Sequence, residues 1–196
     1  MATVLVTGGA GSMGRLVCSR LAADGHAIRA FDLATANFEG LGNGISVLPG
    51  DLTSKTDLKS AIEEVDVVVH LAAILPPAAD EQVELARLVN VHGTKMLVES
   101  MKSNNANARL VFSSSVSVYG APTVDTDVTT SLDYDPDDNY AVTKADSEQI
   151  VVNSGLDYCV LRISGVAIPV FQEPPAAWPF LSDQKIEFIH RDDAAT

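Results

Sequence analysis

The sequence predicts an α/β fold in which helices cover both faces of a doubly wound parallel sheet. Short apolar runs rich in β-branched residues alternate with helical segments six times along the chain. The runs are continuously apolar, as strands buried on both faces are, and a glycine-rich turn joins the first run to the first helix. With 196 residues, 46% of them hydrophobic, the chain is long enough for one sizeable core.

Local patterns set the first elements. Residues 2–7 form a β-branched apolar run that predicts a buried strand. Apolar residues then recur at helical spacing over residues 15–24, and Gly25 follows as a stop signal. A second strand is expected at residues 27–31 and ends at Asp32.

The middle of the chain continues the alternation. Residues 33–44 are a loop rich in Gly, Asn and Ala, and residues 45–48 predict the third strand. Thr53 or Ser54 is suited to cap a helix that runs to about residue 64. The later elements, in chain order, are a strand at 65–70, one long helix at 80–103, a strand at 109–112, a polar loop at 120–139, a helix at 140–153 and a strand at 158–163.

Composition excludes several classes of partner. The formal net charge of −13 repels phosphate backbones and anionic lipid, so we expect neither a nucleic-acid nor a membrane partner. The apolar stretch that begins at residue 65 is interrupted by His70 and is too short to span a bilayer. Cys18 and Cys159 lie in apolar stretches and read as buried thiols, which fits a cytoplasmic protein. The four histidines show no metal-ligand spacing, so no metal site is predicted.

The glycine-rich turn predicts a dinucleotide site in a Rossmann-like sheet. Gly8, Gly11 and Gly14 allow a tight turn, and backbone N–H groups at the start of the following helix suit a diphosphate. Asp32 ends the second strand, where a carboxylate accepts hydrogen bonds from ribose hydroxyls and repels a 2′-phosphate. No Arg or Lys occurs in residues 33–44, so the expected cofactor is NAD rather than NADP.

A second group of residues predicts proton transfer. Tyr140 and Lys144 are four positions apart on a predicted helix, so they share a face. A neighbouring ammonium is expected to lower the pKa of the tyrosine from its ordinary value of about 10. Ser115 follows the fifth strand, at the same edge of the sheet, where its hydroxyl is placed to hold a substrate oxygen. The predicted catalytic set is therefore Ser115, Tyr140 and Lys144.

These motifs resemble the extended short-chain dehydrogenase/reductases, the group of the NAD-dependent epimerases and dehydratases, and the serine run is most similar to the sugar-nucleotide 4-epimerases. The resembling stretches are residues 7–14, 51–52, 70–73, 90–94, 112–120, 140–144 and 188–195. The resemblance implies hydride transfer between NAD and a secondary alcohol or carbonyl, with Tyr140 as acid/base, Asn90 near the cofactor, and a homodimer. The predicted cofactor-binding residues are Gly8, Gly11, Ser12, Met13, Gly14, Asp32, Leu33, Asp51, Leu52, Leu71, Ala72, Ala73, Asn90, Ser113, Tyr140 and Lys144.

The end of the chain departs from the family pattern. Gly165 stands where the epimerases usually carry an asparagine that touches the sugar diphosphate, which weakens a nucleotide-sugar assignment. We expect a dinucleotide-binding domain at residues 1–164 and a short, reduced or truncated substrate region at residues 165–196. Within it, the Pro- and aromatic-rich residues 165–182 form either a small hydrophobic lid or a loop packed on the core. The chain stops at Thr196, inside a family-like motif, so a compact variant, a truncated chain and a longer protein all stay open.

Three functional interpretations remain open. The first is an epimerase or dehydrogenase acting on a sugar or nucleotide sugar. The second is a carbonyl reductase or dehydrogenase for a small non-nucleotide substrate. The third is a non-catalytic dinucleotide sensor, a class that typically loses the tyrosine or the lysine, both of which are present here.

Sugar dehydration is disfavoured, because Ser115 is followed by Val116-Ser117-Val118 and not by an acidic pair. The aspartates of residues 125–138 match no EF-hand loop and read as a solvated loop that caps the Tyr140 helix.

Overall fold

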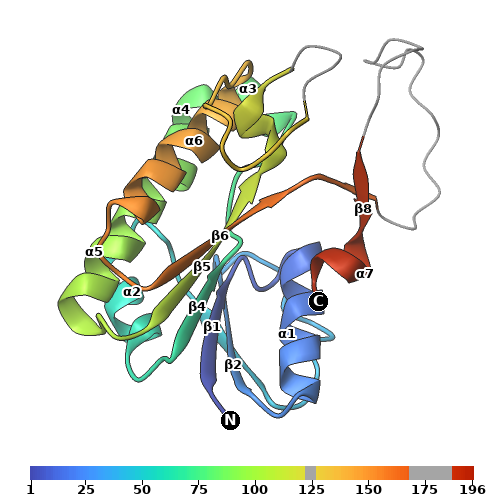
Figure 1. The fold of residues 1–196 in the computed structure, drawn as a ribbon. Coiled ribbons are helices and arrows are strands. Elements are labelled where there is room, and N and C mark those ends of the chain that lie inside the picture. The colour runs from blue at the N-terminus through green and yellow to red at the C-terminus, as the bar shows by residue number, and fades with distance from the viewer. Residues whose placement is uncertain (122–126, 168–186) are drawn as a thin grey trace.

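Six parallel strands form the central sheet of the computed structural model, which describes residues 1–121, 127–167 and 187–196. The sheet has the order β3-β2-β1-β4-β5-β6, so the chain winds outward from β1 in one direction and then in the other (Figure 1). This confirms the predicted doubly wound sheet. The strands are β1 (Thr3–Thr7), β2 (Ala27–Asp32), β3 (Ile45–Pro49), β4 (Val67–His70), β5 (Arg109–Ser115) and β6 (Tyr158–Ile163).

Helices cover both faces of this sheet. Helix α1 (Ser12–Ala23) lies on one face, and α2 (Lys55–Ile62), α5 (Thr94–Asn104) and α6 (Asn139–Val152) lie on the other (Figure 1). The alternation of side chains along β1 serves both layers, because neighbouring residues of a strand point to opposite faces. Val4 and Val6 pack with Cys18 of α1, whereas Leu5 packs in the cluster beneath α2 and α5.

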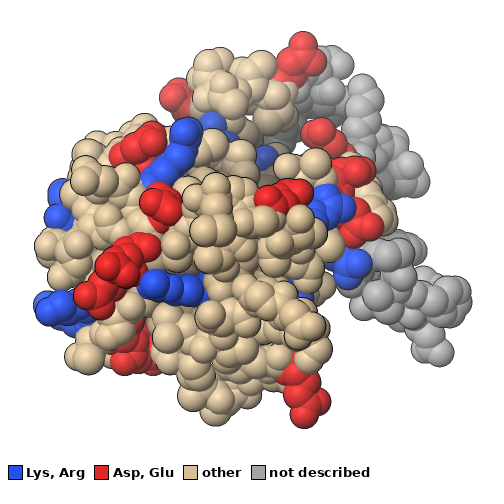
Figure 2. Space-filling model, turned by 90° about the horizontal axis from the view of Figure 1, so that it is seen from below, with Lys and Arg blue, Asp and Glu red and all other residues tan. Residues whose placement is uncertain are grey.

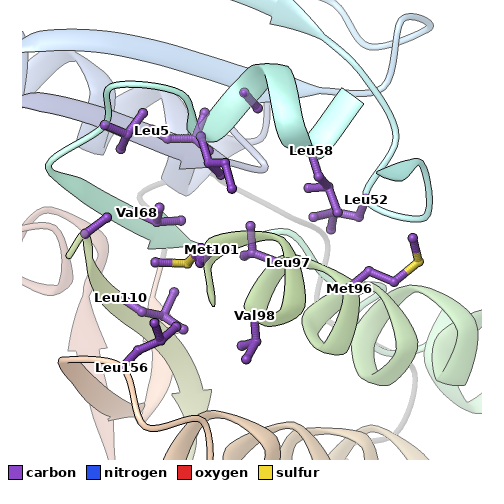
Figure 3. Close-up of a cluster of buried hydrophobic side chains, with 14 of the residues drawn as sticks. Leu5, Leu52, Leu58, Val68, Met96, Leu97, Val98, Met101, Leu110 and Leu156 are labelled. Carbon is purple, nitrogen blue, oxygen red and sulfur yellow. The ribbon is translucent and has the colours of Figure 1, made fainter. Parts of the chain in front are cut away.

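The larger hydrophobic core lies between the sheet and helices α2 and α5. Leu58 of α2, with Leu97 and Met101 of α5, is fully buried against Leu5 and Leu110 of the sheet (Figure 3). Each such side chain contributes about 1.5–3 kcal/mol by leaving water. The core therefore fixes α5 against the middle of the sheet, and with it the segments that lead to the carboxyl ends of the strands.

The prediction of a single long helix at residues 80–103 is wrong, because the structure divides this region into several helical segments. Gln82, with φ −123° and ψ 61°, interrupts it, and a π-helical segment follows before α5. Within that segment the carbonyl of Asn90 accepts hydrogen bonds from Thr94 Oγ1 at 2.5 Å and from Ser147 Oγ at 2.9 Å. Side-chain donors that compete for a helix carbonyl favour such a local distortion. The elements here are α3 (Ala78–Glu81), α4 (Val83–Ala86) and the π-helical η1 (Arg87–Gly93).

Side-chain caps fix the starts of two helices. Ser54 accepts a hydrogen bond from Asp57 N at 3.3 Å and so caps α2, which decides between the two residues predicted for that role. Asp138 accepts one from Ala141 N at 2.6 Å and caps α6, as expected of the aspartate-rich loop. Strand β5 runs three residues further than predicted, to Ser115, before the 3-10 helix η2 (Val116–Tyr119).

The described end of the chain forms a second, two-stranded parallel sheet. It consists of β7 (Gly165–Ala167) and β8 (Phe188–His190), and the short helix α7 (Arg191–Ala194) follows directly. The hydrophobic side chains on which the predicted lid depends lie outside the described residues, as does Asp125 of the aspartate-rich loop; they are Phe171, Pro174, Pro175, Trp178, Pro179 and Phe180.

Charged side chains are interspersed on the face shown in Figure 2, where the described Lys and Arg residues form no continuous basic surface. No helix within residues 1–121, 127–167 and 187–196 is both long and apolar enough to cross a membrane. The same ranges contain no group of three or more His, Cys, Asp or Glu side chains arranged to hold a metal ion. Both cysteines are free thiols; Cys18 is buried, as predicted, but Cys159 is only partly buried on β6.

Candidate active site

A cavity of about 440 Å³ opens at the carboxyl ends of β1 to β4. It lies where the strand order reverses beside β1, which is the place where ligands bind in open parallel sheets. Most of the predicted cofactor-binding residues line it, namely Gly8, Gly11, Ser12, Met13, Gly14, Asp32, Leu33, Asp51, Leu52, Leu71, Ala72 and Ala73. The sequence analysis missed other lining residues, namely Phe31, Gly50, Ile74, Leu75, Val89, Val166 and Arg191.

The glycine-rich turn brings backbone donors to the wall of the cavity. Gly8 has a φ of +72°, and a Cβ there would lie 2.9 Å from the backbone nitrogen of Ala72. Only glycine therefore lets the end of β1 pass this close to the loop after β4. Gly11 precedes α1 without offering a capping side chain, and the first turn of the helix holds no acidic residue. The N–H groups in the first turn of α1 and the positive end of the helix dipole fit the diphosphate of a dinucleotide.

Asp32 is held rigidly at the end of β2. Its Oδ2 accepts a hydrogen bond from Ala10 N at 3.0 Å, and its Oδ1 accepts one from Leu33 N at 2.9 Å. Each carboxylate oxygen keeps a further lone pair for ribose hydroxyls. The nearby cation Arg15 is committed elsewhere, donating to the carbonyl oxygens of Ala10 at 2.8 Å and Glu39 at 2.7 Å.

Lys144 of α6 belongs to the predicted catalytic set. Its side chain is buried, and Nζ donates a hydrogen bond to the carbonyl oxygen of Ser113 at 2.7 Å. The same atom lies 5.7 Å from the centre of the Tyr140 ring and 5.0 Å from that of Phe112. Burial lowers the pKa of Lys144 to about 8, although the charge of Glu148 acts in the opposite direction. The structure thus brings Tyr140 and Lys144 together on one helix face, as predicted.

The expected effect of Lys144 on Tyr140 is wrong for this structure. Burial, and then the negative charge of Asp138, raise the pKa of Tyr140 to about 12. Removal of the Tyr140 phenol from water disfavours its deprotonated, charged form. The Lys144 ammonium is also buried, and its hydrogen bond goes to the carbonyl of Ser113 and not to the phenol. Tyr140 therefore carries its proton at neutral pH.

Ser115 ends β5, two residues beyond the carbonyl that Lys144 holds. Its Oγ accepts hydrogen bonds from Ser117 N at 3.1 Å and from Ser117 Oγ at 2.8 Å. Both contacts use the serine oxygen as acceptor, so its hydroxyl proton is available to a substrate oxygen. Ser113, Ser115, Tyr140 and Lys144 do not themselves line the cavity described above, and no described residue hydrogen-bonds the Tyr140 hydroxyl.

Asn90, predicted to bind the cofactor, is placed behind the cavity and not on its wall. Its amide accepts from Ile74 N at 2.7 Å and donates to Ile74 O at 3.0 Å and to Thr143 Oγ1 at 2.9 Å. Because the amide makes these contacts inside the protein, Asn90 acts as a bracket between the loop after β4 and helix α6. Thr143 in turn donates to the carbonyl of Tyr140 at 2.8 Å.

A buried chain of hydrogen bonds extends this bracket to the glycine-rich turn. Thr7 Oγ1 lies 2.7 Å from Nδ1 of His70, and Nε2 of His70 lies 2.9 Å from Thr94 Oγ1, which donates to Asn90 O. Burial, with a smaller contribution from the charge of Lys144, lowers the pKa of His70 to about 3, so the ring is neutral. The chain therefore links the last residue of β1 to the helix that carries Tyr140 and Lys144.

A buried charged network, which the sequence analysis missed, anchors the other side of α6. Glu148 lies one turn beyond Lys144 and accepts hydrogen bonds from Arg162 Nη2 at 2.8 Å, from Tyr134 Oη at 2.6 Å and from Ser114 Oγ. Burial alone would raise the pKa of Glu148, but these hydrogen bonds outweigh it and lower the pKa. The network joins β5, β6 and α6 beside Ser115.

Comparisons with known proteins identify a matching family and related folds. The family model described as the NAD dependent epimerase/dehydratase family matches residues 4–175. A D-erythronate dehydrogenase from Cupriavidus necator is 32% identical over an alignment of 197 residues, which covers 91% of this chain and 60% of that protein.

Two solved structures share the fold over nearly the whole chain. The UDP-N-acetylglucosamine 4-epimerase from Methanobrevibacter ruminantium has a TM-score of 0.84 at 26% identity, covering 99% of this chain and 70% of that one. The UDP-glucose 4-epimerase from Thermus thermophilus, solved in complex with NAD, has a TM-score of 0.84 at 25% identity, covering 98% of this chain and 72% of that one. The chain spans about half the length of the curated relatives it matches.

Proposed function

Because the chain belongs to the NAD dependent epimerase/dehydratase family, we propose that it is an NAD-dependent oxidoreductase with Tyr140 as its proton donor and acceptor. The substrate is a secondary alcohol or the corresponding carbonyl compound, of the sugar or sugar-acid class. The observation that carries the proposal is the placement of Lys144, which is buried, bonded to Ser113 at 2.7 Å and set 5.7 Å from the centre of the Tyr140 ring.

The cavity residues hold the cofactor in this proposal. The N–H groups that begin α1 bind its diphosphate, and Asp32 accepts hydrogen bonds from the ribose nearest the adenine. When bound there, NAD would supply the hydride acceptor for the oxidation and, in its reduced form, the hydride donor for the reverse reaction. Two features of the cavity fit this ligand: α1 begins without a side-chain cap, and the glycine-rich turn before it has no side chain at Gly8.

The chain's own side chains move the proton. In the reduction, Tyr140 gives its hydroxyl proton to the substrate oxygen, and its raised pKa means that it holds this proton at neutral pH until the transfer occurs. The oxidation is the reverse step, in which Tyr140 first loses its own proton to solvent and its oxygen then accepts the proton of the substrate hydroxyl. Ser115 donates a hydrogen bond to the substrate oxygen throughout and holds it in place. The Lys144 ammonium holds the carbonyl of Ser113 and so keeps Ser115 and Tyr140 in position for this transfer.

One observation favours a small substrate over a nucleotide sugar. Gly165, at the position of the family's diphosphate-binding asparagine, has no side chain and is packed in the β7–β8 sheet, where an added Cβ would lie 3.0 Å from the ring of Phe188. The position therefore supplies no side-chain hydrogen-bonding group to a sugar diphosphate. A sugar acid, the substrate class in the name of the Cupriavidus relative, needs no such group.

The proposal is tested by a substrate screen that follows NADH absorbance with sugar acids such as D-erythronate, nucleotide sugars and small aldehydes. In the Tyr140→Phe variant we expect turnover to fall by about 10²–10⁴-fold with NAD affinity nearly unchanged. Tyr158→Phe, which changes a partly exposed tyrosine on β6, is the matched control and should keep full activity. Full activity in Tyr140→Phe would refute the assignment of the acid/base, and a wild-type protein that binds no NAD would refute the function itself.

We also propose a homodimer formed through η1, α5 and α6. Leu85 and Leu88 are 40% and 47% exposed beside α6, which gives this face apolar side chains to bury. Light scattering tests the proposal, and Leu88→Glu should produce a monomer. The cytoplasmic location predicted from the two cysteines stays a prediction.

A further inference from the structure

Arg191 reaches the cofactor cavity from the far end of the chain. It is the first residue of α7, directly after β8, and its side chain lines the cavity together with Ser12 and Met13 at the start of α1. Two contacts place it there. Strand β8 pairs with β7, with Ile189 opposite Val166, and Arg20 of α1 donates a hydrogen bond to Thr196 Oγ1. Figure 1 shows α7 beside α1.

The charge of Arg191 is unusual for its surroundings. It is the one cation among the described residues that line the cavity, whose other charged residues are Asp32 and Asp51. The whole chain carries a formal net charge of −13. A diphosphate that enters this cavity is therefore repelled by the carboxylates and by the overall field unless a local cation compensates.

The guanidinium also has unused donor capacity. Its Nε is buried, yet within the described residues it has no hydrogen-bond partner. Asp192 Oδ1 lies 3.5 Å from this atom, close enough for a loose ion pair but without forming a hydrogen bond. A buried, unpaired N–H is unfavourable in the unliganded protein, and an anionic oxygen in the cavity would satisfy it.

We propose that Arg191 binds the diphosphate of the dinucleotide, opposite the N–H groups of the α1 start. The inference rests on the proposed function and deepens it by naming a ligand-binding residue outside the nucleotide half of the chain. Arginine suits the role, because its planar guanidinium offers paired donors to phosphate oxygens. The segment 187–196 thus completes the cofactor site and does not serve the substrate alone.

The test measures dissociation constants by calorimetry for NAD, ADP-ribose and adenosine with the wild type and Arg191→Gln. We expect NAD and ADP-ribose to bind about ten- to a hundredfold more weakly to the variant, while adenosine, which lacks the diphosphate, binds equally well. Arg191→Lys should recover part of the loss. An unchanged NAD affinity in Arg191→Gln, or an equal loss for adenosine, would overturn the inference.

Arg20→Gln is the matched control. It removes the contact with Thr196 that holds the same segment against α1, but Arg20 does not line the cavity. Because the pairing of β7 with β8 still holds the segment, we expect its NAD affinity to fall clearly less than that of Arg191→Gln. If Arg20→Gln weakened NAD as much as Arg191→Gln, anchoring of the segment and not phosphate binding would explain both results. A wild type that fails to bind NAD would reject the proposed function, whereas a binding wild type with an unaffected Arg191→Gln rejects this inference alone.

Discussion

The ammonium of Lys144 donates a 2.7 Å hydrogen bond to the backbone carbonyl of Ser113. This single contact ties α6 to β5 two residues before Ser115, so the three groups of the proposed catalytic set depend on one buried cation for their relative positions. The burial that makes the contact precise also disfavours the charge on the lysine.

That conflict predicts a pH-dependent contribution of Lys144 to stability. Its pKa in the folded protein is about 8, against 10.5 for the free side chain, so between these values the unfolded chain binds a proton that the folded chain does not. The wild type should therefore become more stable relative to Lys144→Met as pH rises from 8 to 10.5, by up to about 3 kcal/mol. Urea unfolding of both proteins across this range measures the difference.

The control for this experiment is Lys95→Met, which changes an exposed lysine on α5. A difference between wild type and Lys144→Met that stayed constant from pH 8 to 10.5 would contradict the proposed burial of the ammonium.

The bracket formed by Asn90 predicts a coupled loss of stability and cofactor affinity. Asn90→Ala removes the partners of both backbone polar groups of Ile74, which should cost about 1–3 kcal/mol. It also loosens the loop after β4 that lines the cavity, so NAD should bind more weakly. Asn104→Ala is the control, since among the described residues the side chain of this exposed asparagine bonds only to Ser100 of its own helix. Comparable effects in the two variants, by urea unfolding and calorimetry, would argue against a bracket.

The cavity was predictable because its parts follow directly from local sequence patterns. Gly8 follows β1 directly, and Asp32 is the last residue of β2. Because the strands are parallel, their carboxyl ends lie at the same edge of the sheet. The pairing of Tyr140 with Lys144 needed only the period of a helix. The caps at Ser54 and Asp138 likewise depend on residues three positions away.

Features set by distant contacts were not predictable in this way. The π-helical segment depends on Ser147, which reaches Asn90 O from 57 positions along the chain. Arg191 reaches the cavity only through the pairing of β7 with β8. The raised pKa of Tyr140 depends on burial, which helix spacing does not reveal, so a prediction from the neighbouring charge alone had the wrong sign.

The fixed carboxylate of Asp32 predicts a preference for NAD over NADP. In Asp32→Ala the affinities for the two dinucleotides should converge, because the repulsion of a 2′-phosphate and the hydrogen bonds to the ribose are both lost. Asp51→Ala, in the same cavity, should weaken both ligands alike and keep their ratio. Calorimetry that showed tighter binding of NADP to the wild type would overturn this assignment.

The buried pair of Glu148 and Arg162 predicts the largest loss of stability from a single polar substitution. Glu148→Gln preserves shape but leaves the Arg162 guanidinium without its carboxylate, which should cost about 3–5 kcal/mol in urea unfolding. Asp146→Asn is the control, because Asp146 lies on the same helix as Glu148 but forms an exposed ion pair with Arg87 of η1, and its loss should cost less than about 1 kcal/mol. The lowered pKa of Glu148 means that its contribution is complete above the ordinary carboxyl pKa and is lost as pH falls through the folded value. The gap between wild type and Glu148→Gln should therefore close in acid, and a gap that stayed constant down to the acid transition would show that the carboxylate charge is not what stabilises the network.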